Sequence, residues 1–182
     1  MKLLSLPTNQ GKGAAVRRGV LASVGDQVLY MDADLATPMA ELEKLRAAID
    51  DGADVAFGSR GLPSSNLRRT QGKIRESMGR TFNVIVQRTV LHGASDTQCG
   101  FKLLTARAAK AIFQELSVSR FAFDVEVLLL AHELGFRLKE VPIEWYHDPQ
   151  SSVSPVFDAA RMLVDVIRLR VGRGARRRLP GL

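Results

Sequence analysis

Two aspartates one residue apart, Asp32 and Asp34, are the residues of this chain best suited to carry out chemistry. They follow the apolar run 28–31, which predicts a buried strand. Because alternate side chains of a strand share a face, the two carboxylates are expected to converge on one point. At the carboxyl tip of a strand in an α/β protein, two hard oxygen donors suit Mg²⁺ or Mn²⁺ bridged to a diphosphate. The alternative is an acidic turn in which Asp34 caps the helix after Pro38.

The sequence Gly11-Lys12-Gly13 opens a predicted helix. Glycines allow the backbone to approach a ligand, and the start of a helix favours anions. The spacing of a Walker A loop is absent, and an ordinary turn is the alternative.

Basic residues follow the third predicted strand. Arg60 is expected at the same edge of the sheet as the two aspartates if the strands are parallel, where it could clamp a phosphate. The polar loop 59–73 adds Arg68, Arg69 and Lys73 to the same positive field. Solvated loop charge is the alternative for the loop arginines.

A second concentrated motif runs from Asp96 to Lys102 and places a carboxylate, the amide of Gln98, a glycine and a lysine before a short strand. Capping of a turn is the alternative role for Asp96. The lone cysteine, Cys99, excludes an intramolecular disulfide and is expected to be a small packing residue.

Several classes of protein are excluded by motif and composition. The three histidines lack the spacing of a zinc site, and no G-x-S-x-G elbow supports serine hydrolysis. No signal peptide is visible, and no apolar run approaches the length of a membrane-spanning helix.

The alternation of strands and helices predicts one α/β domain, with a mainly parallel sheet and helices on both faces, over residues 1–171. Residues 172–182 are expected to be a basic disordered tail. Val16, Val20 and Val24 form the expected buried face of the first helix. Strands are predicted at 2–6, 27–31, 54–57, 101–104 and 137–143, and helices at 13–24, 38–50, 75–91, 106–115, 124–134 and 155–171.

Positive charge is concentrated at the end of the chain. Residues 158–182 hold seven arginines and two aspartates, a balance of +5 out of a net charge of +7. Such a tail meets anionic lipid or nucleic acid, or serves as a solubilising terminus. Nucleic acid is the least favoured partner, because the tail has no interleaved aromatic residues.

The last predicted helix carries an apolar stripe flanked by arginines. An interfacial amphipathic helix and a core-packing helix would both show it. The stripe consists of Phe157, Ala160, Val164, Ile167 and Val171.

Together these motifs resemble family 2 glycosyltransferases, closest to the dolichyl-phosphate β-glucosyltransferase and polyprenyl-phosphate glycosyltransferase branch. Members of the family carry an N-terminal β-α-β segment before the stretch that corresponds to residues 9–13, and this chain lacks it. The resemblance therefore implies an N-terminally truncated, GT-A-like nucleotide-diphospho-sugar transferase fold. The matching stretches are residues 9–13, 31–34, 57–60, 96–102, 121–126 and 140–145.

The resemblance implies a metal-dependent, inverting transfer of a hexose, glucose or mannose, from UDP-glucose or GDP-mannose to a polyprenyl or dolichyl phosphate. The protein would be peripheral at the cytoplasmic, inner face of the cell membrane, and oligomers are possible through an exposed sheet edge. The resemblance implies that Asp32 and Asp34 hold Mg²⁺ or Mn²⁺, and that Gly11 and Lys12 contact the nucleotide sugar. It implies that Arg60 binds phosphate. It also implies that Asp96 and Gln98 face the sugar and the acceptor, with Asp96 at the position of the family's proposed base.

A lipid monophosphate acceptor changes what the site must supply. Its second pKa is near 6, so its oxygen is largely anionic at pH 7 and a strong base is hardly required. The main need is neutralisation of charge by Arg60, Arg68, Arg69 and Lys73 together with the metal. The alternative function is a non-catalytic truncated remnant that binds lipid or a partner through its basic C-terminal helix.

Overall fold

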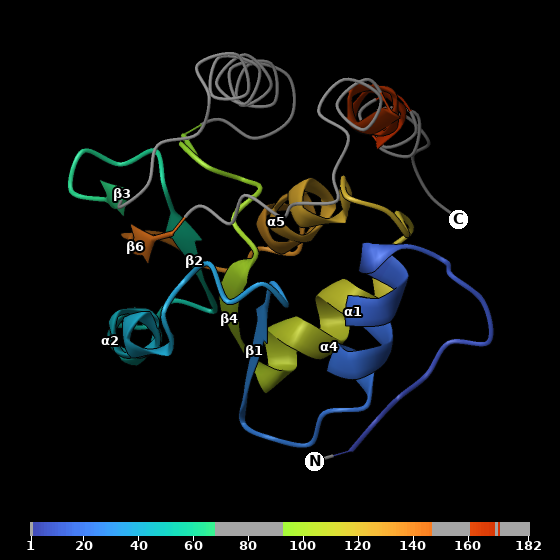
Figure 1. The fold of residues 1–182 in the computed structure, drawn as a ribbon, viewed down its shortest axis with the longest axis horizontal. Helices are drawn as coiled ribbons and strands as arrows, with labels where there is room; N and C mark the ends of the chain where they lie inside the picture. Colours follow the sequence, from blue (N-terminus) through green and yellow to red (C-terminus); the bar gives the residue numbers. More distant parts are fainter. Residues whose placement is uncertain (1, 68–92, 147–160, 170, 172–182) are drawn as a thin grey trace.

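The computed structural model describes residues 2–67, 93–146, 161–169 and 171 (Figure 1). The predicted helix 75–91 and the tail 172–182 lie outside the described residues. The same is true of three predicted phosphate-binding residues, Arg68, Arg69 and Lys73. No helix within the described ranges is long and apolar enough to cross a membrane.

A four-stranded sheet forms the centre of the molecule, in the order β1-β4-β2-β5. Strands β1, β2 and β5 share one direction, and β4 runs against its neighbours β1 and β2. The predicted mainly parallel sheet therefore has mixed pairing, because hydrophobic periodicity does not encode the direction of a strand. The strands are β1 (Gln27–Met31), β2 (Val55–Ser59), β4 (Phe101–Thr105) and β5 (Leu138–Pro142).

The reversed direction of β4 decides where the site forms. Met31, the last residue of β1, pairs with Phe101, the first residue of β4. The start of β4 therefore lies at the edge where β1 and β2 end, and the motif that precedes β4 reaches the aspartates that follow β1.

Helices cover both faces of the sheet (Figure 1). On one face, Tyr30, Leu104 and Phe113 belong to a buried cluster formed with α1, α4 and α5. On the other face, Leu45 of α2 packs with Phe101 in a second cluster. The helices are α1 (Lys12–Leu21), the 3₁₀ turn η1 (Met39–Glu41), α2 (Leu42–Asp50), α4 (Ala106–Glu115) and α5 (Phe123–Glu133).

Two outer pieces complete the described structure. Strand β3 (Asn66–Leu67) pairs in parallel with β6 (Glu144–Trp145), a two-stranded sheet that the sequence patterns did not predict. Residues 161–169 are helical, and Val166 packs with Ala122 in a third buried cluster.

Local sequence patterns predicted some elements correctly and others wrongly. The strand 27–31 and the helix 106–115 are confirmed at both ends. The predicted strand 2–6 is wrong, because this segment pairs with no strand among the described residues and its Leu3 is 83% exposed. The first helix ends at Leu21, so Val24 lies outside it and is 98% exposed instead of buried.

The two glycines of α1 are expected to respond oppositely to alanine. A Cβ at Gly13 would lie 2.7 Å from the Val118 carbonyl oxygen and 2.8 Å from the Phe123 Cβ, whereas at Gly19 it would meet nothing within 4 Å. We expect Gly13→Ala to lower the free energy of unfolding by about 1–2 kcal/mol through overpacking. Gly19→Ala should raise it by roughly 0.5–1 kcal/mol through helix propensity. Urea unfolding of both variants tests this, and an equal effect at both positions would contradict the close contact.

Candidate functional site

Asp32 and Asp34 lie in the turn that follows β1, because the strand ends at Met31. The alternation expected to align them therefore does not apply. The Asp32 N–H donates to the Gly100 carbonyl over 2.8 Å, and Asp34 Oδ1 accepts from the Ala36 N–H over 3.1 Å. Asp34 thus closes the turn itself. The alternative prediction, that Asp34 caps the helix after Pro38, is wrong, because the N-cap of that helical turn is Pro38 and no side chain caps it. Asp34 is exposed, and the Asp32 side chain is 38% exposed.

Gly100 is the cradle for the Asp32 side chain. A Cβ on Gly100 would overlap the Asp32 carboxylate, so the carboxylate can occupy this place only beside a glycine. Accessible carboxylates are hard oxygen ligands suited to Mg²⁺ or Mn²⁺. Among the described residues no group of three or more acidic, histidine or cysteine side chains could hold a metal ion. Asp32 and Asp34 supply two such carboxylates in this turn.

A partly buried ionic network connects Asp32 to α5. Lys12 Nζ lies 2.7 Å from Asp32 Oδ1 and 3.2 Å from Asp124 Oδ2. Asp124 Oδ1 also accepts from Lys102 Nζ over 2.6 Å and from the Tyr30 hydroxyl over 2.9 Å. Burial alone lowers the pKa of Lys12, but the charges of Asp124 and Asp32 raise it above its ordinary value, so the ammonium stays charged.

The structural roles of Lys102 and Asp124 were not predicted from the sequence. The helix predicted at 124–134 begins at Phe123 with Ala122 as its N-cap, so Asp124 lies in its first turn. One signal was present: Lys102 and Leu104 are two residues apart in a predicted strand, so they share a face. Lys102 is 0% exposed, and a lysine on a buried face requires a carboxylate partner.

The predicted Gly11–Lys12 ligand loop divides into two roles. Gly11 has a φ of 98°, and a Cβ there would lie 2.5 Å from the Ser119 carbonyl oxygen, so this glycine permits close packing of the backbone. The side chain of Lys12 alone reaches the aspartate site.

Arg60 and Asp96 form a two-pronged ion pair. Arg60 Nε and Nη2 donate to Asp96 Oδ2 and Oδ1 over 2.6 and 3.0 Å, and the guanidinium lies over the Trp145 ring at 5.4 Å from its centre. Asp96 is 1% exposed and also accepts hydrogen bonds from the backbone N–H groups of Arg60 and Gln98. The bond from the Gln98 N–H is the turn cap that was predicted for Asp96. Burial alone raises the pKa of Asp96, but the charge and hydrogen bonds of Arg60 hold it below its ordinary value. Such a carboxylate is a weak base.

Glu140 holds the loop that carries Asp96. Its two carboxylate oxygens accept from the Ser95 N–H at 3.0 Å, and Oε1 also accepts from the Asp96 N–H at 2.9 Å. Glu140, in the middle of β5, therefore fixes the loop that holds Arg60, a role that the sequence patterns did not indicate.

The loop 96–99 also holds buried polar atoms without partners. Thr97 Oγ1 and Gln98 Nε2 lack hydrogen-bond partners within the described structure. Such atoms are uncommon in native proteins, where water or a bound group usually supplies the partner. Cys99 is buried, which confirms its packing role. Burial is the main cause that raises the pKa of its thiol to about 12.

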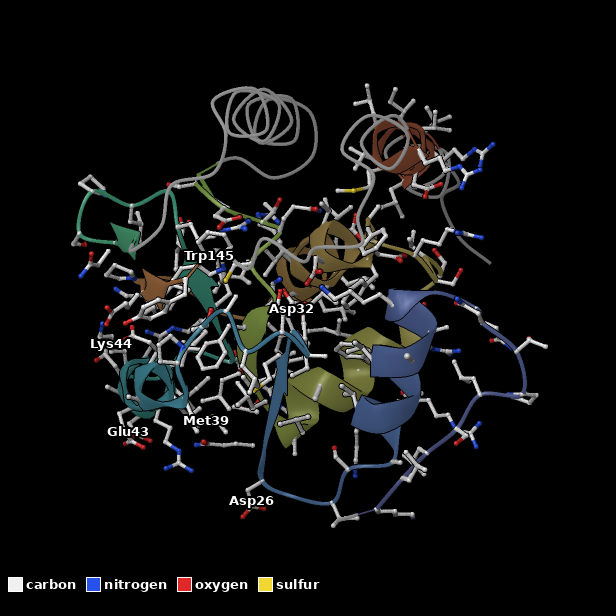
Figure 2. The ribbon with its side chains drawn as sticks, viewed as in Figure 1. Asp26, Asp32, Met39, Glu43, Lys44 and Trp145 are labelled. Carbon is white, nitrogen blue, oxygen red and sulfur yellow. The ribbon has the colours of Figure 1, made fainter. Side chains whose placement is uncertain are left out.

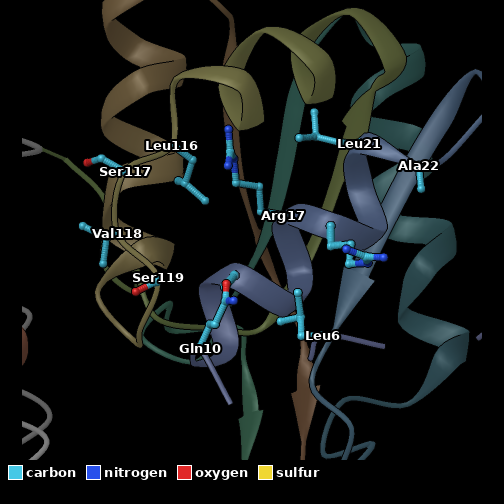
Figure 3. Close-up of a pocket in the computed structure, with 11 residues that line it drawn as sticks. Leu6, Gln10, Arg17, Leu21, Ala22, Leu116, Ser117, Val118 and Ser119 are labelled. Atoms are coloured by element: carbon cyan, nitrogen blue, oxygen red, sulfur yellow. The ribbon is translucent and has the colours of Figure 1, made fainter. Parts of the chain in front are cut away.

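Two cavities differ in their relation to these residues. A narrow space of about 10 Å³ lies beside Asp32, Arg60 and Trp145. A wider cavity of about 530 Å³ lies between α1 and the segment 116–119, with Arg17 on its wall (Figure 3). None of the predicted site residues that the structure describes lines the wider cavity.

The chain belongs to glycosyl transferase family 2, whose family model matches residues 1–113. It is 36% identical to a dolichyl-phosphate beta-glucosyltransferase of Dictyostelium discoideum, covering 93% of this chain and 54% of that protein. It is also 36% identical to the mouse (Mus musculus) protein of the same name, covering 96% of this chain and 56% of the relative. The chain thus spans about half the length of these relatives.

The fold is similar to that of glucosyl-3-phosphoglycerate synthase from Mycobacterium tuberculosis. The structure of that enzyme with UDP gives a TM-score of 0.66 at 14% identity, covering 92% of this chain and 57% of the other. Its complex with Mn²⁺, UDP-glucose and glycerol 3-phosphate gives 0.67 at 16% identity, with the same coverage. This likeness shows a GT-A-like glycosyltransferase fold.

Asp96→Asn is expected to lower stability most above pH 4. Because the pKa of Asp96 is lower in the folded chain than in the unfolded one, its stabilisation is present above about pH 4 and is lost as the pH falls further. Removing one partner of a buried ion pair costs about 3–5 kcal/mol, so we expect a loss of that order at pH 6 and a smaller one at pH 2.5. Denaturant unfolding across this range measures it.

The exposed Asp50→Asn serves as the control and should shift the free energy of unfolding by less than about 0.5 kcal/mol. An Asp96→Asn loss that is as large at pH 2.5 as at pH 6 would contradict the ion pair with Arg60.

Proposed function

We propose that the chain is a metal-dependent, inverting glycosyltransferase that moves glucose from UDP-glucose to a polyprenyl or dolichyl phosphate. The observation that carries the proposal is the pair of accessible carboxylates, Asp32 and Asp34, beside lysine and arginine cations at one edge of the sheet. The names of the relatives support glucose over mannose and dolichyl phosphate as the acceptor. The complexes of the structural neighbour support UDP-glucose and Mn²⁺.

The metal ligands in this proposal are Asp32 and Asp34. The Gly100 cradle and the outward exposure of Asp34 fit a cation shared with a diphosphate. Bound Mg²⁺ or Mn²⁺ would supply Lewis-acid stabilisation of the charge on the departing nucleoside diphosphate.

The reaction needs charge neutralisation more than proton transfer. An oxygen of the acceptor phosphate attacks C1 of the sugar, and the bond from C1 to the diphosphate oxygen breaks with its electrons on UDP. Attack from the opposite side inverts an α-linked donor to the β product. The acceptor oxygen is already ionised, so no base is needed, which agrees with the commitment of both Asp96 oxygens to Arg60. Arg60 neutralises charge between the two anions.

The polar atoms without partners suggest where the sugar is held. The hydroxyl of Thr97 and the amide nitrogen of Gln98 are buried donors in the loop beside Arg60. Sugar hydroxyls are suitable partners for both atoms. We therefore assign these two residues to the orientation of the hexose.

Metal-dependent binding of the donor tests the proposal. Titration of UDP-glucose with Mn²⁺ into this chain, followed by calorimetry, should show binding that Asp32→Asn/Asp34→Asn reduces at least tenfold, because both carboxylate ligands lose their charge. Asp26→Asn is the matched control, since Asp26 lies at the opposite end of β1 (Figure 2). Glucosyl transfer to a polyprenyl phosphate should be lost in the same double variant. Equal binding in both variants would contradict the metal site, and donor binding without transfer would favour a non-catalytic chain.

We further propose that the final helix rests on the cytoplasmic face of a membrane. The structure separates its two faces: Val166 and Leu169 are buried, whereas Val164 and Ile167 of the predicted stripe are 46% and 54% exposed. Arg168 beside them is exposed, with its side chain at 78%. An exposed apolar stripe next to arginines suits the surface of an anionic bilayer.

Vesicle binding tests this surface. We expect the chain to sediment with phosphatidylcholine vesicles that contain 30% phosphatidylglycerol, and Val164→Asp/Ile167→Asp to weaken this binding several-fold by placing charge on the apolar stripe. Val24→Asp is the control, because Val24 is equally apolar and 98% exposed away from this helix. Equal loss in the control and the double variant would contradict a specific face.

A further inference from the structure

Lys12 already neutralises the carboxylate that we assign to the metal. Its Nζ lies 2.7 Å from Asp32 Oδ1 and 3.2 Å from Asp124 Oδ2, and the ammonium stands 5.3 Å from the centre of the Phe123 ring. The side chain is 26% exposed. Two carboxylates and an aromatic face therefore hold the ammonium at one place beside Asp32.

The two carboxylates depend on Lys12 to different degrees. Asp124 has a second lysine, because Lys102 Nζ lies 2.6 Å from its Oδ1, and the Tyr30 hydroxyl donates to the same oxygen. Asp32 has Lys12 as its ion-pair partner in the described structure. Removal of the Lys12 charge would therefore leave Asp124 paired and Asp32 available.

A divalent cation at Asp32 would stand next to the ammonium. Like charges at contact distance repel, and partial burial weakens the screening that water provides. A diphosphate would add negative charge beside both cations and would offset this repulsion. The free metal should therefore bind weakly, and the metal together with the donor should bind well.

We propose that Lys12 keeps the affinity of Asp32 for a free divalent cation low and so couples metal binding to binding of the donor diphosphate. This inference rests on the proposed function, since it takes Asp32 as a metal ligand. Coupling between two ligands is reciprocal, so the factor by which UDP tightens metal binding must equal the factor by which metal tightens UDP binding.

Calorimetric titration with Mn²⁺ alone, and then with Mn²⁺ at saturating UDP, tests the coupling. We expect Lys12→Met and Lys12→Gln to bind Mn²⁺ without UDP about tenfold more tightly than the original chain, and the enhancement by UDP to shrink by a similar factor. Lys12→Arg keeps the charge and should retain weak binding of free Mn²⁺. Lys44→Met is the matched control, because Lys44 is ion-paired with Glu41 on the other side of the sheet (Figure 2).

The outcomes separate this inference from the proposed function. Asp32-dependent Mn²⁺ binding that is unchanged in Lys12→Met and Lys12→Gln would overturn the role of Lys12 and leave the metal site intact. No Mn²⁺ binding in any variant, or binding that persists in Asp32→Asn, would overturn both. Tighter binding in Lys44→Met as well would assign the effect to net charge and overturn the inference. Circular dichroism establishes that each variant is folded.

Discussion

The reversed β4 between β1 and β2 is the constraint on which the site depends. It brings the start of β4 to the edge where β1 ends, so that Gly100 meets Asp32. It also directs Lys102 into the apolar face beneath the helices, where a charged group must be paired. Asp124 at the start of α5 supplies the partner. The helix is therefore tied to the sheet by charge as well as by packing, and the aspartate site forms at that junction.

Two ion clusters at this edge of the sheet differ in how firmly their side chains are held. Asp96 commits both of its oxygens to Arg60 and is held in turn by Glu140, so that cluster is fixed before any ligand arrives. Asp32 is partly exposed and bound to the long, flexible side chain of Lys12, so that cluster can exchange partners. A rigid cation beside an exchangeable carboxylate suits a reaction whose main demand is neutralisation of charge.

The sequence predicted what depends on local pattern. Strand 27–31 and helix 106–115 were correct because an apolar run and helix propensity act within a few residues. The extended segment 2–6 failed because a strand requires a neighbour that no local pattern reveals. The alternation invoked for Asp32 and Asp34 does not apply, because both residues lie in the turn after Met31 and a turn does not continue the alternation of the strand.

Contacts distant in the chain were out of reach for the same reason. Glu140 binds Ser95 and Asp96, which lie 45 and 44 residues before it in the chain. Lys12 binds Asp124, which lies 112 residues after it. Only the family resemblance singled out both stretches together.

The motif at residues 11–13 carries two constraints that reinforce each other. Gly11 and Gly13 both lie against the backbone of residues 118–119, where a side chain at either position would collide. The lysine between them therefore has its backbone fixed on the segment that leads into α5, the helix that carries Asp124. A flexible lysine anchored in this way delivers its ammonium to a defined point between Asp124 and Asp32. The glycines thus act on the site through the position of Lys12.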